Sequence, residues 1–217
     1  MTKSAAGRYQ PATGMEAESE PGSRGRVLRN KLGLRQKRDM DRAEYEALGR
    51  VQGHYLSLIT PETAFTAALL SEMHRAWLGE IYEWAGQYRT VEMEKDGFRW
   101  PPAYRVAPNM DQLEQGLLRQ HTPCRSAPIK VVAQRLAEVH AELLLVHPFR
   151  DGNGRLARWL ADLMALQAGL PTPDYRFRGR GSGQQRARYL AAVKQGYLTR
   201  YDDLAGFFAE AVRRGLG

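Results

Sequence analysis

The sequence predicts an all-α protein, a helical bundle from which one β-hairpin projects. Apolar residues recur every three or four positions in several long segments, which is the spacing of an amphipathic helix. Proline and glycine mark the ends of several of these segments. Only residues 88–105 change to an alternating pattern, and no internal repeat or heptad array is present. These observations predict helices packed on helices, with one short extended insertion.

Helices are expected over residues 38–58, 60–86, 110–121, 128–146, 155–169 and 182–216, the last segment forming one or two helices. The second is predicted to begin with Thr60 as its N-cap and Pro61 in its first position, and to end at Gly86. Segment 155–169 is apolar on most sides and ends at Gly169, so it is expected to be the most buried helix.

The hairpin is predicted from the turn at its tip. Asp96 and Gly97 stand between two extended runs, and Asp-Gly is a strong signal for a tight β-turn. One hairpin cannot build a sheet of its own inside a helical protein. Residues 88–105 are therefore expected to form a projecting flap.

Length and composition indicate a soluble globular protein. The 217 residues are 43% hydrophobic and 26% charged, and a single cysteine, Cys124, excludes internal disulfides. No apolar run reaches the roughly 18 residues of a membrane span, and the N-terminus lacks the apolar region of a secretory signal. We expect a flexible tail over residues 1–14, one domain over residues 15–217, and a cytoplasmic location.

The net charge of +8 is concentrated in two basic clusters. Residues 1–38 contain nine Lys or Arg against three Glu, and residues 176–188 contain five arginines. Such clusters attract phosphates, nucleic acid or acidic proteins, but a charge cluster is more often a solvated face. A nucleic-acid-binding module is therefore an alternative, and charge alone does not make it the expectation.

One stretch between two predicted helices, "HPFRDGNGRLAR" at residues 147–158, differs from the rest of the chain. A helix N-terminus presents unpaired N–H groups and a partial positive charge. Gly152 and Gly154 allow a tight turn and a close approach of the backbone to a ligand. Arg155 and Arg158 lie about one helical turn apart, and guanidinium groups bind phosphate in a bidentate manner. This loop therefore predicts a cradle for a polyphosphate.

Asp151 and His147 add a metal ligand and a base to the predicted cradle. A carboxylate beside phosphates is expected to bind Mg²⁺, which takes one or two carboxylates together with phosphate oxygens. A neutral histidine at the rim can accept the proton of an attacking hydroxyl. Together they predict transfer from a Mg–nucleotide to a hydroxyl. A zinc site of His140, His147 and Asp151 also fits the spacing, but it leaves both arginines without a role.

The stretch resembles the signature of the Fic family, H-x-F-x-[D/E]-G-N-G-R-x-x-R, and matches it at every specified position. The segments "VLRNKLGL" and "IYEWAGQYRTV" and the hairpin extend the resemblance over about residues 20–210. It implies an all-α Fic fold with the hairpin as a flap over the active site. It also implies transfer of AMP from Mg–ATP to a Ser, Thr or Tyr hydroxyl of a target protein.

The resemblance assigns roles to individual residues. His147 is expected to be the catalytic base and Asp151 the Mg²⁺ ligand. The residues expected to bind the nucleotide phosphates are Gly152, Asn153, Gly154, Arg155 and Arg158. The flap residues expected to dock the target segment by strand addition are Lys95, Asp96, Gly97 and Phe98.

Many Fic proteins carry an inhibitory helix, [S/T]-x-x-x-E-[G/N], whose glutamate pairs with the second motif arginine. Residues 90–94 fit its first five positions but lie inside the flap, and Thr199 is followed four residues later by Asp203. The chain therefore resembles the class inhibited by a separate antitoxin protein, with this chain as the toxin. By analogy with short Fic toxins, a type II topoisomerase subunit is a candidate target.

The same resemblance leaves alternatives for the transferred group. A Doc-like kinase transfers the γ-phosphate, and some relatives use other nucleotides as donors. The sequence Gly152-Asn153-Gly154-Arg155 favours the AMP-transferring pattern.

Overall fold

The computed structural model describes residues 15–216, so the tail predicted over residues 1–14 lies outside the described residues. Its α-helices are α1 (Lys37–Leu58), α2 (Ala67–Leu78), α3 (Val106–Leu113), α4 (Arg119–His121), α5 (Ile129–Val146), α6 (Asn153–Gln167), α7 (Ser182–Gly196) and α8 (Asp202–Gly215). The strands are β1 (Glu94–Lys95) and β2 (Phe98–Arg99), and short turns form η1 (Met15–Ala17), η2 (Ala103–Arg105) and the π-helical η3 (Glu114–Leu118). The prediction of an all-α fold with one hairpin is confirmed.

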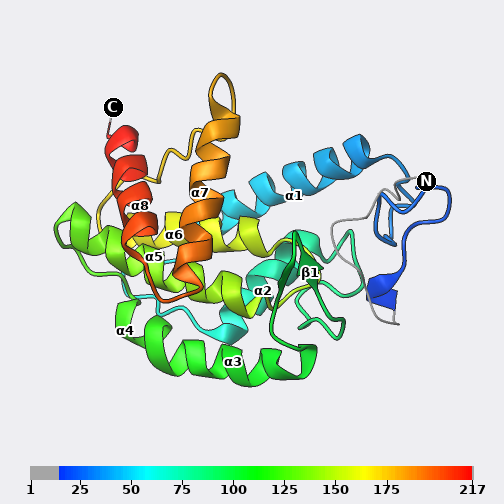
Figure 1. Cartoon of the computed structure of the whole chain (residues 1–217), viewed down its shortest axis with the longest axis horizontal. Helices are drawn as coiled ribbons and strands as arrows, with labels where there is room; N and C mark the ends of the chain where they lie inside the picture. Colours follow the sequence, from blue (N-terminus) through cyan, green and yellow to red (C-terminus); the bar gives the residue numbers. More distant parts are fainter. Residues whose placement is uncertain (1–14, 217) are drawn as a thin grey trace.

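Helix α5 runs through the middle of the molecule, and α3, α6, α7 and α8 pack around it (Figure 1). Its helical stripe is buried, as the spacing predicts: Val132, Leu136, Val139, Leu143 and Val146. Helix α6, which was predicted to be the most buried, shares this central position with α5 and buries both Trp159 and Met164. The loop that joins these two helices, residues 147–152, is therefore anchored at both ends in the core.

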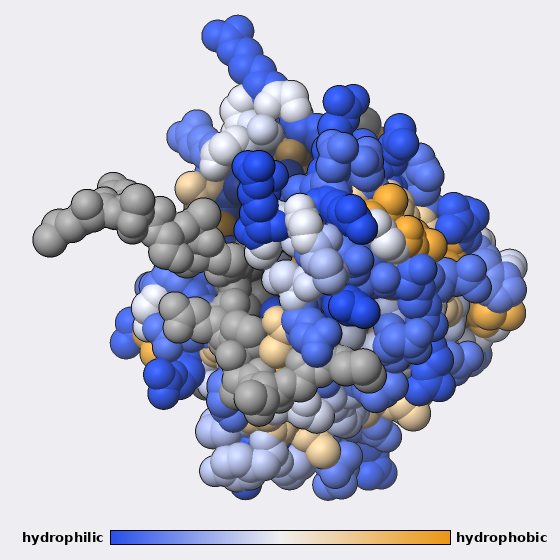
Figure 2. Space-filling model, turned by 90° about the vertical axis from the view of Figure 1, so that its right-hand side faces the viewer, coloured by the Kyte–Doolittle hydropathy of each residue, from blue (hydrophilic) through white to orange (hydrophobic). Residues whose placement is uncertain are grey.

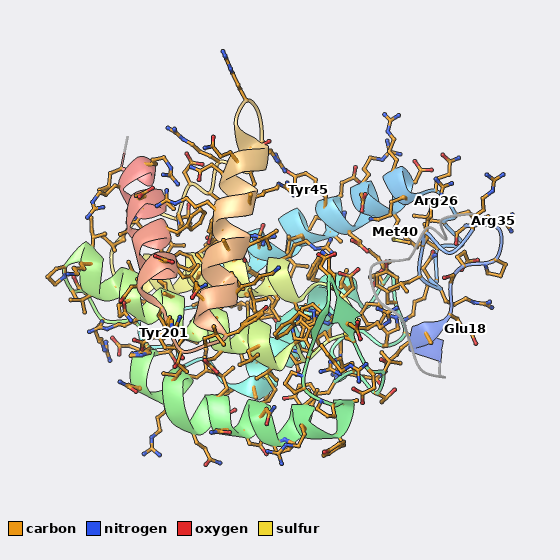
Figure 3. The ribbon with its side chains drawn as sticks, in the orientation of Figure 1. Glu18, Arg26, Arg35, Met40, Tyr45 and Tyr201 are labelled. Carbon is orange, nitrogen blue, oxygen red and sulfur yellow. The ribbon has the colours of Figure 1, made fainter. Side chains whose placement is uncertain are left out.

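A second hydrophobic cluster lies between α1, α2 and the segment that precedes α1. It includes Val27, Met40, Trp77 and Tyr82. Met40 lies near the start of α1, close to the segment that carries Glu18, Arg26 and Arg35 (Figure 3). This cluster holds α1 against the C-terminal part of α2, on one side of the loop 147–152.

The helix predicted over residues 60–86 is shorter than expected, and the prediction of Thr60 as its N-cap is wrong. Helix α2 begins after Thr66, whose hydroxyl accepts the N–H of Leu69 at 3.1 Å. Thr60 instead belongs to a turn in which its N–H donates to the Thr63 hydroxyl at 2.9 Å. The intervening segment is not helical and buries Phe65 in the core, so tertiary packing overrides the local start signal.

The prediction that the same helix ends at Gly86 is also wrong, because α2 ends at Leu78. The chain then turns through Ile81 and Tyr82, both buried, before it reaches Gly86 with a φ of +77°. A Cβ at Gly86 would lie 2.6 Å from Cβ of Arg75 on α2. Glycine here allows the returning chain to approach α2, a role different from ending it.

The hairpin forms at the predicted turn. Glu94 pairs with Arg99 and Lys95 with Phe98, while Asp96 and Gly97 both have positive φ, as a two-residue hairpin turn requires. Beside the strands, Val91, Met93 and Trp100 form a small buried cluster of their own. This cluster attaches the flap to the helical core.

The surface is dominated by hydrophilic residues on the face that Figure 2 shows, with hydrophobic residues in small separate groups. Within residues 15–216, no helix has the length and apolar character needed to cross a membrane.

Candidate active site

His147 ends helix α5 in a left-handed conformation, with a φ of +52°. Its Nδ1 lies 3.1 Å from the carbonyl oxygen of Leu144. Because a carbonyl can only accept, Nδ1 carries the proton and Nε2 keeps its lone pair. Burial lowers the pKa of His147 to about 3, so the imidazole is neutral at physiological pH. The loop therefore presents a neutral base with a fixed tautomer.

The backbone that follows His147 is fixed by Phe149 and Asn153. Phe149 is fully buried and stacks on His74, with ring centroids 3.9 Å apart. The Asn153 amide accepts the N–H of Phe149 at 2.9 Å and donates to its carbonyl at 2.7 Å. Asn153, predicted to bind phosphate, thus uses its side chain to close the loop. Only its backbone N–H stays available for a ligand.

Gly152 caps the N-terminus of α6 with a φ of +85°. Its carbonyl accepts the N–H groups of both Arg155 and Leu156 at 2.9 Å. The first-turn donors that can face an anion are therefore the N–H groups of Asn153 and Gly154. The N–H of Gly152 itself donates to the Asp151 carboxylate at 2.5 Å. A positive helix end thus lies beside the one carboxylate of the loop.

His74, on α2, fixes the backbone of Asp151 through a hydrogen bond. Its Nδ1 accepts the N–H of Gly86 at 2.9 Å, so Nε2 carries the proton that it donates to the Asp151 carbonyl at 3.0 Å. The side chain is fully buried, and burial lowers the pKa of His74 to about 4. His74 lies 77 residues from Asp151 in sequence, and no local pattern indicated its role.

Arg155 contacts two residues, Glu44 and Trp77, for which the sequence predicted no role in the site. Its guanidinium forms an ion pair with Glu44 of α1 at 2.5 Å and lies 3.5 Å from Asp151. It also lies 4.5 Å from the ring of Trp77. Glu44 is buried and accepts the hydroxyl of Tyr82 at 2.5 Å. Arg155 therefore links α1 to the Asp151 carboxylate.

Arg158 has different surroundings from Arg155. Its guanidinium carbon lies 5.5 Å from the ring of Phe177 and 5.9 Å from that of Tyr189. One guanidinium nitrogen lies 3.5 Å from the position that a Cβ on Gly154 would take. Arg158 is half-buried and lies beside the first turn of α6. The two motif arginines thus have different neighbours.

The alternative zinc site does not form. His140 donates from Nδ1 to the Ala157 carbonyl at 3.1 Å and accepts the Tyr189 hydroxyl at Nε2 at 2.7 Å, so both of its nitrogens are used. Within residues 15–216, no three His, Cys, Asp or Glu side chains are grouped closely enough to hold a metal ion alone. Asp151 contributes one carboxylate, about a quarter exposed, which suits Mg²⁺ shared with phosphate oxygens.

The flap reaches the site through Trp100. Its ring lies 4.1 Å from that of His147, and its indole N–H donates to the Leu144 carbonyl at 3.0 Å. At the tip, Lys95, Asp96 and Gly97 are exposed, while Phe98 stacks on Tyr197 of the chain after α7 at 4.9 Å. The structure thus brings the predicted flap and the predicted base together.

Gly152→Ala is expected to lower the free energy of unfolding by about 2–5 kcal/mol, since it adds left-handed strain to overpacking. A Cβ at this position would lie 2.8 Å from the Trp77 ring and 3.1 Å from Nε2 of His74. Urea unfolding measures the change. Gly154→Ala is the matched control, because its Cβ would have only an ordinary contact, 3.5 Å from Arg158. Equal stability of the two variants would contradict the close packing at Gly152.

Comparison with known proteins agrees with this geometry. Residues 64–165 match the model of the Fic/DOC family. Protein adenylyltransferase VbhT of Bartonella schoenbuchensis is 30% identical over 144 residues, which cover 66% of this chain and 30% of that protein. A probable protein adenylyltransferase of Sinorhizobium fredii is 28% identical over 190 residues, covering 87% of this chain and 90% of the relative.

A solved structure has the same fold. The BepC protein of Bartonella tribocorum, crystallised with AMPPNP, superposes with a TM-score of 0.69 over 85% of this chain and 91% of that one, at 22% identity. The matched region contains helix α2, the flap, helix α5 and the complete loop 147–158. Residues 64–165 therefore match the Fic/DOC family, and the chain has the fold of the solved neighbour.

Proposed function

We propose that this protein transfers AMP from Mg–ATP to a hydroxyl side chain of a target protein. The observation that carries the proposal is the position of His147. Its neutral imidazole, with the lone pair on Nε2, stands in the same short loop as the N-terminus of α6. A proton acceptor and a phosphate-binding helix end are the two groups that such a transfer requires.

The residues divide the work as follows. The N–H groups of Asn153 and Gly154 would bind phosphate oxygens, and Arg158 would hold the far end of the phosphate chain. The target hydroxyl oxygen forms a bond to the α-phosphorus, and its proton passes to Nε2 of His147. The bond from the α-phosphorus to the bridging oxygen breaks, and pyrophosphate leaves with the electron pair. Catalysis rests on positioning and charge stabilisation, with His147 as the base.

Asp151 would hold Mg²⁺ together with the phosphates, and Mg²⁺ supplies neutralisation of their negative charge. Four neighbouring residues hold Asp151 in the position from which it would bind the metal. Its backbone is held by His74 and its side chain by the N–H of Gly152 and by Arg155, which Glu44 in turn anchors. Arg155 thereby supports Asp151, and its role as a phosphate ligand stays part of the proposal.

Relatives support the proposed activity by their names, since the similar curated proteins are called protein adenylyltransferases. The neighbour BepC was crystallised with AMPPNP, an ATP analogue, which supports ATP as the nucleotide. The chain matches only 30% of the length of VbhT, so the target of this chain is a separate question.

Labelled ATP tests the transferred group. Protein in cell lysate should acquire label from Mg–ATP labelled at the α-phosphate and none from ATP labelled at the γ-phosphate. Retention of the γ-label would favour the Doc-like kinase, and transfer only from another nucleotide would correct the donor. Omission of Mg²⁺ should abolish labelling. Mass spectrometry of proteins from cells that express the chain would identify the target and its modified residue.

A separate antitoxin and a type II topoisomerase target remain part of the proposal. Glu94, the glutamate of the better match to the inhibitory pattern, lies in β1 and pairs with Arg99 of the flap, which favours an inhibitor supplied by another protein. A protein encoded next to this chain should then suppress labelling when co-expressed. Unchanged labelling in its presence would contradict the toxin–antitoxin arrangement. A topoisomerase subunit that acquires no AMP would contradict the proposed target.

The basic cluster at residues 176–188 gives little support to the alternative of a nucleic-acid-binding module. Three of its arginines pack on the protein itself: Arg178 over Tyr45 of α1 at 4.8 Å, Arg186 over Phe177 at 5.4 Å, and Arg188 on Glu210 at 2.5 Å. Figure 3 shows Tyr45 on the part of α1 that faces the segment before α7. These contacts give the cluster a role in packing. A steep fall of DNA affinity with salt would revive the alternative.

A further inference from the structure

Arg89 is a buried residue that has no role in the mechanism proposed above. It is 2% exposed and lies where the chain enters the flap. Its side chain donates to three backbone carbonyls: from Nε to His147 at 2.8 Å, and from its two terminal nitrogens to Val91 at 2.9 Å and to Pro101 at 2.6 Å. One guanidinium therefore contacts both the catalytic loop and the flap.

The three carbonyls belong to segments that must be held together for transfer. Val91 precedes β1 and Pro101 follows β2, so Arg89 ties the two arms of the flap at its base. The third carbonyl is that of His147, and the backbone N–H of Arg89 donates to the next carbonyl, Pro148, at 2.8 Å. The start of the flap is thus hydrogen-bonded to the backbone of His147, the proposed catalytic base, and of Pro148.

The way in which Arg89 is buried favours this joining role. Within residues 15–216, no carboxylate forms an ion pair with its guanidinium, and all three of its side-chain partners are carbonyl oxygens. A buried cation is expensive unless its hydrogen bonds are satisfied. Burial lowers the pKa of Arg89, with Glu92 and Glu16 acting in the opposite direction, yet an arginine stays protonated in proteins.

Arginine is suited to this position and lysine is not. The guanidinium is a planar fork with five donors in fixed directions, whereas an ammonium group is a compact charge on a flexible stem. Three carbonyls on three separate segments match the fork. His147 also has a positive φ, so its backbone conformation depends on the contacts around it.

We propose that Arg89 is a positioning residue that fixes the flap to the backbone of His147, so that a target strand docked on the flap delivers its hydroxyl to Nε2. The inference rests on the proposed function for its catalytic consequence. The joint between flap and loop is a property of the structure itself and has its own test.

Arg89→Lys and Arg89→Gln are the test variants, compared with Arg99→Gln. Arg99 lies on β2 of the same flap, is exposed, and pairs with Glu94, so its replacement removes one flap charge without touching the joint. Transfer from α-labelled Mg–ATP should fall about 10²-fold in both Arg89 variants, because a misplacement of about 1 Å has that effect. Arg99→Gln leaves the joint intact, so the exchange of the flap amides in that variant should match that of wild type.

Two readouts distinguish positioning from a general loss of fold. The affinity for Mg–ATP should be unchanged in Arg89→Lys, since the phosphate-binding turn of α6 is not part of the joint. Hydrogen exchange in Arg89→Lys should become about tenfold faster at the flap amides, including that of Trp100, with α5 and α6 still protected. The exchange measurement does not depend on transfer, so it tests the joint even if wild type transfers no AMP.

Three outcomes would overturn the proposal. The first is wild-type transfer by Arg89→Lys. The second is unchanged exchange of the flap in that variant. The third is loss of Mg–ATP binding in both Arg89 variants, because Arg89 would then support the fold as a whole.

Discussion

Replacement of His147 by asparagine is expected to lower AMP transfer by about 10²–10⁴-fold, the usual contribution of a positioned general base. Asparagine is the informative choice because it tolerates the left-handed backbone that His147 adopts, whereas alanine would add strain. The amide cannot accept and hold a proton at neutral pH. The affinity for Mg–ATP should be unchanged, since the N–H groups proposed to bind phosphate lie in α6.

The control for this variant is His54→Asn, which replaces an exposed histidine on α1 and should leave transfer unchanged. The pH dependence gives a second check. Because burial lowers the pKa of His147 to about 3, wild-type transfer should lack an acid limb near about pH 6.5, where a free histidine titrates. Full transfer by His147→Asn, or an acid limb near that pH, would contradict the role of a buried neutral base.

Replacement of Asp151 by asparagine is expected to lower transfer by about 10²–10³-fold, because charge neutralisation by a bound metal contributes several kcal/mol. The amide has almost the shape of the carboxylate and can still accept the N–H of Gly152. Arg155 keeps its ion pair with Glu44, so the loop should stay folded. The expected defect is therefore in Mg²⁺ use rather than in stability.

A titration of Mg²⁺ at fixed ATP measures this defect. Asp151→Asn should need a higher Mg²⁺ concentration for half-maximal transfer, and the maximum should stay below that of wild type. Asp111→Asn, which replaces an exposed carboxylate on α3, should follow the wild-type curve. An Asp151→Asn variant with the wild-type Mg²⁺ curve would exclude this carboxylate as the metal ligand.

The order of the helices and the hairpin could be predicted from the sequence, because local patterns of apolar and turn residues determine where each element forms. The apolar stripe over residues 129–146, the glycine at position 152 and the apolar run after it predicted two buried helices joined by a loop. The Asp96-Gly97 turn predicted the hairpin at the position where it forms. Helix boundaries were less predictable, since α2 begins at Ala67, after its cap Thr66, because Phe65 enters the core from a segment that is not helical.

The sequence by itself determined the chemistry that the loop 147–158 can offer, because its base, carboxylate, glycines and arginines lie within a dozen residues. Only the tertiary structure decided how those groups are held. His74, Glu44 and Arg89 lie 77, 111 and 58 residues from the loop partners they contact. Their roles come from packing between distant segments, and no spacing pattern in the chain records such contacts. The structure links α1 to Asp151 through Arg155, whose role as a phosphate ligand stays a prediction, and it joins the flap to His147 through Arg89.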